Sequence, residues 1–150
     1  MDLSDIWSAI VAAVLSLIPV SGKLDGTWIE AEQIKGNPRV ALHFKGNSVT
    51  FENLYDKALT VKYTVSERTF DDFTITVEYK HDIQKPNGRV VEHEFSHEFL
   101  YHVENGRPIL SEKGFEYDGR GSIILSEYLR KENFEDGFKS ELKRKYNSKE

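Results

Sequence analysis

Residues 89–103 read RVVEHEFSHEFLYHV, and the alternation in this stretch decides the fold class. The odd positions from Val91 to Val103 are apolar, aromatic or histidine, whereas the even positions from Glu92 to Glu98 are glutamate or serine. A period of two residues is typical of a β-strand with one buried and one solvated face. The Asn87-Gly88 pair just before it predicts a tight hairpin turn. We therefore expect a long strand here, antiparallel to the one before it.

The same stretch contains HEFSH, His93 to His97, which matches the H-E-x-x-H zinc signature of metalloproteases. That signature requires a helix, which brings both histidines to one metal. On a strand, residues four apart lie about 13 Å from each other, whereas two nitrogens bound to one zinc lie within about 4 Å. Glu94 would also point away from both histidines. The sequence therefore predicts no metal site and no protease, and without another catalytic motif we expect a non-enzymatic protein with no cofactor.

Alternation of the same kind continues on both sides of this stretch. Residues 40–45, 48–53, 59–65 and 73–80 each place apolar side chains at every second position, and Gly46-Asn47, Asn105-Gly106 and Asp118-Gly119 mark turns. No pattern suggests a helix between two parallel strands. We predict a mainly β chain of about eight strands in an antiparallel up-and-down barrel over residues 26–130, within a single domain spanning 1–150.

Helices are predicted at both ends of the barrel. Residues 6–20 are apolar almost all round, but at fifteen residues they are shorter than the roughly 20 needed to span a bilayer. We expect a helix over 1–20 that packs on the domain or on a second copy, with a membrane-surface anchor or a secretory signal as alternatives. Residues 132–150 predict a second helix with a narrow apolar seam of Phe134, Phe138, Leu142 and Tyr146.

The composition limits the partners. The formal charge is -5 with both signs mixed along the chain, which argues against a nucleic-acid surface. The sequence has no cysteine, so disulfides and thiolate zinc sites are excluded. Localisation stays open, with the cytoplasm favoured over export because Asp2 and Asp5, and no basic residue, precede the apolar run.

The start of the first predicted strand, Gly26-Thr27-Trp28, resembles the G-x-W signature of the lipocalins and their small bacterial lipocalin-like relatives. The apolar segment before it, the strands after it and Arg130 just beyond the last strand add to this resemblance. It implies that Trp28 closes one end of the barrel and that Arg130 packs over its ring in a cation–π contact. It also implies a small apolar or amphipathic ligand inside the barrel.

If the barrel holds a ligand, the inward positions should line its cavity, as an aromatic wall with a few polar groups. The ligand-binding residues predicted in this way are Tyr63, Tyr79, His93, Phe95, His97, Phe99 and Tyr101. His93 and His97 would meet a carboxylate or hydroxyl of the ligand, or else hydrogen-bond their neighbours in a closed core. The alternative function is an interaction module with a filled barrel that acts through its N-terminal helix, by oligomerisation or by binding a partner or a membrane surface.

Overall fold

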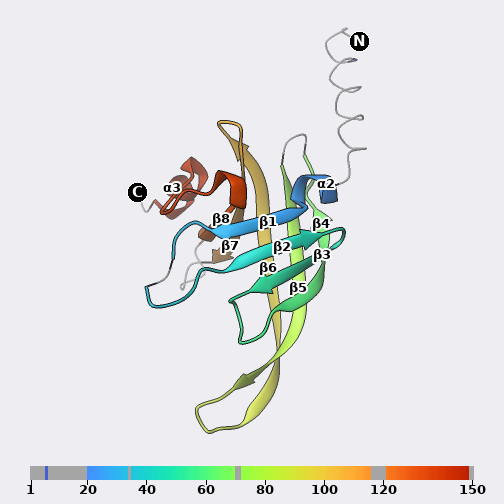
Figure 1. The fold of residues 1–150 in the computed structure, drawn as a ribbon, viewed down its shortest axis with the longest axis vertical. Helices are drawn as coiled ribbons and strands as arrows, with labels where there is room; N and C mark the ends of the chain where they lie inside the picture. The colour runs from blue at the N-terminus through green and yellow to red at the C-terminus, as the bar shows by residue number, and fades with distance from the viewer. Residues whose placement is uncertain (1–5, 7–19, 34, 70–71, 116–120, 149–150) are drawn as a thin grey trace.

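The computed structural model describes residues 6, 20–33, 35–69, 72–115 and 121–148, with no side-chain description at 115. Within them, eight strands form a closed antiparallel barrel in which consecutive strands are neighbours and the last pairs with the first (Figure 1). The strands are β1 (Gly26–Glu30), β2 (Ala41–Lys45), β3 (Ser48–Glu52), β4 (Leu59–Ser66), β5 (Phe73–Gln84), β6 (Val90–Glu104), β7 (Arg107–Phe115) and β8 (Ser122–Arg130). The predicted up-and-down barrel is confirmed.

The barrel is filled at the end where β1 begins. Trp28 is fully buried there, and its indole N–H donates to the carbonyl of Leu24 in the short helix α2 (Val20–Leu24) at 2.9 Å. The guanidinium of Arg130 lies 4.8 Å from the centre of the Trp28 ring, so the expected cation–π contact is present. Gly26 has a φ of 126°, and a Cβ atom there would lie 3.1 Å from Nη1 of Arg130, so both its conformation and its space favour glycine.

Further aromatic side chains pack between this closed end and the centre of the barrel. Phe73 stacks on Tyr101 at 4.5 Å between ring centres, and Tyr101 meets the edge of Trp28 at 6.2 Å. Tyr63 packs against Phe44 at 5.6 Å and donates its hydroxyl to the carbonyl of Gly46. Because these rings contact one another within one buried cluster, this half of the interior is a packed core.

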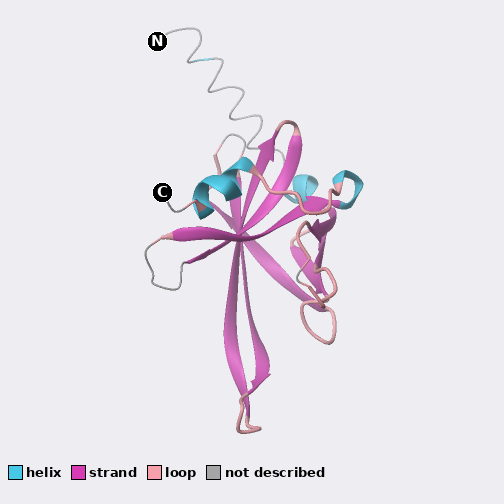
Figure 2. Cartoon of the chain, turned by 90° about the vertical axis from the view of Figure 1, so that its left-hand side faces the viewer, coloured by secondary structure: helices cyan, strands magenta, loops and turns pink. Residues whose placement is uncertain are grey.

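The β5–β6 hairpin is longer than its neighbours. β4 pairs with β5 from Tyr63 to Ser66, and β7 pairs with β6 from Glu98 to Glu104, whereas β5 and β6 remain paired as far as Gln84 and Val90. Residues 78–84 and 90–97 therefore continue as a two-stranded ribbon that leaves the barrel (Figures 1 and 2), and the base of this ribbon, at Tyr79 and His97, still contacts the barrel strands. We call the end of the barrel from which this ribbon leaves the mouth.

The C-terminal segment differs from the single helix predicted over 132–150. It consists of a 3₁₀ turn η1 (Lys131–Asn133), an irregular stretch, and the short helix α3 (Glu141–Asn147). Gly137 has a φ of 76°, and Ser140 has an extended backbone and caps α3 by accepting a hydrogen bond from the Lys143 N–H. These two residues prevent one continuous helix. One residue of the predicted apolar seam still attaches this segment to the barrel, since Phe138 packs outside the barrel on Ala31, Ile109 and Leu129.

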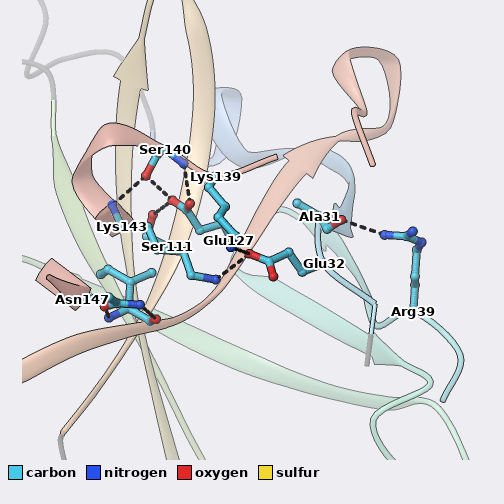
Figure 3. A network of polar contacts seen from close by, with 10 residues as sticks. Ala31, Glu32, Arg39, Ser111, Glu127, Lys139, Ser140, Lys143 and Asn147 are labelled. Atoms are coloured by element: carbon cyan, nitrogen blue, oxygen red, sulfur yellow. Dashed lines mark hydrogen bonds and ion pairs between the residues drawn. The ribbon is translucent and has the colours of Figure 1, made fainter. Parts of the chain in front are cut away.

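A buried carboxylate fixes this segment to the barrel wall (Figure 3). Glu127 of β8 is 2% exposed. It accepts hydrogen bonds from the Ser111 hydroxyl at 2.6 Å, the Ser140 hydroxyl at 2.6 Å and the Ser140 N–H at 2.8 Å. His102 extends the network, with Nε2 lying 2.8 Å from the Ser111 hydroxyl. Since Ser111 donates to Glu127, its oxygen accepts from His102.

His102 should make the fold sensitive to acid. Burial lowers its pKa, an effect that nearby Glu127, Asp72 and Glu104 oppose. A histidine whose pKa is lower in the folded state leaves stability intact above its unfolded pKa, about 6.5, and reduces it as the pH falls below that value. We expect the free energy of unfolding of the wild type to fall more steeply below this pH than that of His102→Gln. Denaturant titrations at a series of pH values measure this, and parallel profiles would contradict it.

The predicted N-terminal helix over 1–20 lies outside the described residues, apart from Ile6 and Val20. Its expected role in packing or anchoring therefore stays a prediction. Within the described part of the chain, no helix is both long and apolar enough to cross a membrane.

Candidate functional site at the barrel mouth

The mouth brings together polar side chains from three neighbouring strands. Tyr79 of β5 lies opposite Phe95, and His97 of β6 lies opposite Val77, so Tyr79 and His97 are diagonal neighbours on the inner face. Glu112 of β7 lies opposite Phe99 and is likewise diagonal to His97. Diagonal pairs of this kind are within reach of long and aromatic side chains. Strand alternation together with this register therefore aims all three side chains at one place.

These residues form a continuous chain of hydrogen bonds that begins on a loop. The hydroxyl of Tyr55, between β3 and β4, lies 2.6 Å from that of Tyr79. The Tyr79 hydroxyl lies 2.7 Å from Nε2 of His97, and Nδ1 of His97 lies 2.7 Å from Oε1 of Glu112. The His97 and Glu112 side chains are only 17% and 15% exposed, so solvent screens this pair weakly.

Aromatic rings hold the chain in place. Tyr55 stacks on His81 at 4.0 Å between ring centres, and Tyr79 stacks on Phe95 at 5.5 Å. Phe51 lies 5.4 Å from the His97 ring on the side of the core. The pKa of Tyr79 is raised well above its ordinary value, mainly by burial and then by the hydrogen bond with Tyr55. Tyr79 therefore remains a protonated hydroxyl at neutral pH.

A second carboxylate lies inside the barrel near the mouth. Glu30 of β1 is 6% exposed. Burial raises its pKa and the charge of Glu112 raises it further, whereas a hydrogen bond with the backbone of Val40 and another with Ser126 lower it. The interior at this end is thus acidic, with the His97 imidazole between Glu112 and Tyr79.

Two clefts open beside the mouth, and Ser96 of β6 borders both. One, of about 540 Å³, is lined by Glu78, Tyr79, Lys80, Glu94, Phe95 and Ser96. The other, of about 510 Å³, is lined by Ser96, His97, Glu98, Glu112, Lys113, Gly114, Ser122 and Leu125. Volumes of this size suit a small organic molecule. The first cleft is lined in part by one member of the hydrogen-bonded chain, Tyr79, and the second by two, His97 and Glu112.

Comparison with known proteins gives no relative for this chain. No family model, no curated protein and no solved structure matches it.

The predicted site residues fall into three places. Tyr79, Phe95 and His97 meet at the mouth, with Phe99 fully buried just below them. Tyr63 and Tyr101 belong to the closed end, in the packed core. His93 lies on the ribbon and is exposed, with its ring 4.7 Å from that of Phe95. It does not line the barrel because it lies farther along the ribbon than His97, which still reaches Glu112 of β7.

HEFSH lies entirely within β6, as the two-residue period predicts. Glu94 is exposed and lies 3.9 Å from the Lys80 ammonium across the ribbon. In the described part of the chain, no three or more histidine or acidic side chains gather where they could hold a metal ion.

Two residues of the mouth are not among the predicted ones, Tyr55 and Glu112. Tyr55 lies in a loop with no alternation, so no periodic pattern could assign it to the interior. Glu112 faces inward from β7, where the predicted wall was apolar and aromatic. The available signal was that Glu112 lies two residues after Leu110 on the same strand, so both side chains face the same side, and Leu110 is buried in the main core. Strand register would have been needed to use that signal.

Proposed function

We propose that the protein is a non-enzymatic binding protein that takes a small amphipathic molecule at the barrel mouth. The observation that carries this proposal is the hydrogen-bonded chain from Tyr55 to Glu112, set in an aromatic wall and flanked by two clefts. Convergent polar groups in an otherwise apolar and aromatic surround are typical of small-molecule sites.

In this proposal the ligand binds at the mouth and not deep in the barrel. Trp28, Phe73 and Tyr101 pack against one another at the closed end, and Phe51 and Phe99 are 2% and 1% exposed below the mouth. The apolar part of the ligand would therefore lie along Phe95 and Tyr79 at the base of the ribbon, and its polar end would meet the hydrogen-bonded chain.

Binding is a better reading of this geometry than catalysis. A carboxylate beside a histidine can orient a general base, but here the second ring nitrogen of His97 already faces the Tyr79 hydroxyl. The raised pKa of Tyr79 makes that hydroxyl a weak nucleophile at neutral pH. The arrangement thus provides fixed hydrogen-bonding groups without a free base.

Titration with a neutral fluorescent lipophile such as phenylnaphthylamine tests the proposal. We expect saturable binding by the wild type, weakened about tenfold by His97→Ala because that change removes a ring from the wall and leaves Glu112 and Tyr79 without their shared partner. His93→Ala should have a much smaller effect, because His93 is exposed on the ribbon.

Glu92→Ala is the matched control, since Glu92 is exposed on the outer face of the ribbon. It should bind like the wild type. If the wild type takes up neither this probe nor other lipophiles, or if His97→Ala binds with unchanged affinity, the proposed site is wrong.

A further inference from the structure

We propose that the ribbon is a dimerisation arm, in which the free edge of β5 pairs with the same edge of a second copy of this chain. The free edge is the side of residues 78–84 that faces away from β6. Two ribbons would then join into one four-stranded antiparallel sheet around a two-fold axis beside His81. This inference goes beyond the proposed function and does not depend on it, because it concerns the edge of the ribbon and not the groups at the mouth.

The first step is that β5 has an unpaired edge. The pairing of β4 with β5 ends at Val77, whereas β5 itself continues to Gln84. Figure 2 shows the ribbon projecting away from the other strands. Within the described residues, β6 is therefore the only strand paired with residues 78–84. A strand edge of this kind is a template for a further strand, and a two-stranded ribbon gains stability when more strands are added.

The second step identifies the backbone groups that the free edge presents. The N–H of Lys85 donates to the carbonyl of Arg89 at 2.8 Å, so the backbone groups of residue 85 point into the hairpin. Along an antiparallel strand these groups alternate between the two sides. Those of residues 79, 81 and 83 therefore also point toward β6, and those of residues 78, 80, 82 and 84 point toward the free edge. A second copy can pair with this edge only where even residues lie opposite even residues.

The third step is that charge selects one of the allowed registers. When His81 lies opposite His81 of the second copy, Lys80 lies opposite Asp82 on both sides of the axis. Glu78 then lies opposite the neutral Gln84. Moving the axis by one residue places either two Lys80 side chains or two Asp82 side chains opposite each other. Opposite charges across an antiparallel pair are stabilising and like charges are destabilising, so the register centred on His81 is favoured.

The other pairings fit less well. Centring the axis on Ile83 places Pro86, which has no N–H to donate, opposite Lys80. The free edge of β6 carries Glu92 and Glu94 and has no lysine or arginine from residue 90 to residue 96. Two copies of that edge would therefore bring together acidic side chains without an opposite charge.

The hairpin itself leaves a charge that the second copy would match. Asp82 lies directly opposite Glu92 of β6, so two like charges face each other across the ribbon. In the proposed dimer, Lys80 of the second copy approaches Asp82 from the other side. The pairing would therefore offset a repulsion that a single ribbon contains.

Sedimentation velocity of the full-length protein tests the pairing. We expect the wild type to form a reversible dimer with a Kd below about 1 mM. Asp82→Lys should weaken the dimer about tenfold or more, because the new lysine lies opposite Lys80 at both contacts. The same change removes the repulsion from Glu92, so it should not weaken the ribbon itself. The double variant Lys80→Glu with Asp82→Lys should restore the dimer, since opposite charges meet again.

Lys45→Glu is the matched control for a change of charge. Lys45 is exposed at the end of β2 and is not part of the ribbon, so this variant should associate like the wild type.

Single cysteines test the register, because the sequence contains no cysteine of its own. His81→Cys should form a disulfide-linked dimer under mild oxidation, since the Cα atoms of a directly opposed pair without backbone hydrogen bonds lie about 4.5 Å apart, which is within the range of a disulfide. His93→Cys should crosslink much less, because His93 lies opposite His81 on β6 and is therefore one strand farther from the axis.

Three results would overturn the inference. The first is a wild type that remains monomeric up to about 1 mM. The second is an association that Asp82→Lys leaves unchanged or that the double variant fails to restore, since another surface would then be responsible. The third is equal crosslinking of His81→Cys and His93→Cys, which contradicts an axis beside His81. None of these results bears on ligand binding at the mouth, which the titration with the fluorescent lipophile tests separately.

Discussion

Trp28→Ala should lower the free energy of unfolding by about 3–5 kcal/mol, the range for removing a large buried aromatic side chain. Trp28 is fully buried and holds two other parts of the chain. Its N–H donates to Leu24, which fixes α2, and its ring lies under Arg130, which in turn donates to the backbone carbonyls of Asp25 and Lys23. The substitution leaves a cavity at the closed end and frees the Arg130 guanidinium.

Chemical denaturation followed by circular dichroism measures this loss. Tyr146→Ala is the control, an aromatic residue on α3 that is 39% exposed and should change stability by about 0.5 kcal/mol or less. Trp28→Phe should lie between the wild type and Trp28→Ala, because it keeps an aromatic ring and loses the hydrogen bond to Leu24. Similar stabilities for Trp28→Ala and Tyr146→Ala would show that Trp28 does not anchor the closed end.

Glu127→Ala should also cost about 3–5 kcal/mol, because it breaks a buried network and leaves hydrogen-bond donors without an acceptor. The Ser111 and Ser140 hydroxyls and the Ser140 N–H all donate to this carboxylate (Figure 3). Besides the loss of global stability, the substitution should loosen α3 locally. Ser140 caps α3, so the amide of Lys143, which donates to the Ser140 hydroxyl, should exchange its hydrogen faster.

Denaturant titration and amide hydrogen exchange measure the two effects. Glu94→Ala is the matched control, since its side chain is 82% exposed, and it should leave both measurements almost unchanged. Glu127→Gln should destabilise less than Glu127→Ala, because the amide oxygen can still accept from Ser140. If Glu127→Ala matches the control, the carboxylate does not hold the C-terminal segment to the barrel.

The fold class could be predicted because it depends on local alternation. In residues 91–103 and 73–79, the odd or even position of each residue assigns its side chain to one face of the strand, and turn residues separate one strand from the next. The same reasoning placed His93 and His97 on a strand and not on the helix that the zinc motif requires. The helix predicted over 132–150 was wrong in its first half because Gly137 and Ser140 interrupt an apolar spacing that otherwise fits a helix.

The candidate site was only partly predictable for a different reason. Odd–even alternation along the strands predicts the inward side chains of Tyr79, Phe95 and His97. It does not reveal how far each strand extends past its neighbours. That extent places His93 on an exposed ribbon and Tyr101 in the core, although both share the face of His97. Tyr55 enters from a loop, whose conformation is set by what it packs against and not by a period.

The sequence by itself determined the strands and their faces, since these follow from periodicity, and the resemblance of Gly26-Thr27-Trp28 to a lipocalin signature led to the expected contact of Trp28 with Arg130. Only the tertiary structure decided which end of the barrel is filled and which hydrogen-bonding groups meet at the other. Tyr55 and Glu112 are 57 positions apart in the chain, and they join one hydrogen-bonded chain only because strand register and barrel closure bring β3, β5, β6 and β7 together. Register is a property of pairs of strands, so no single stretch of sequence contains it.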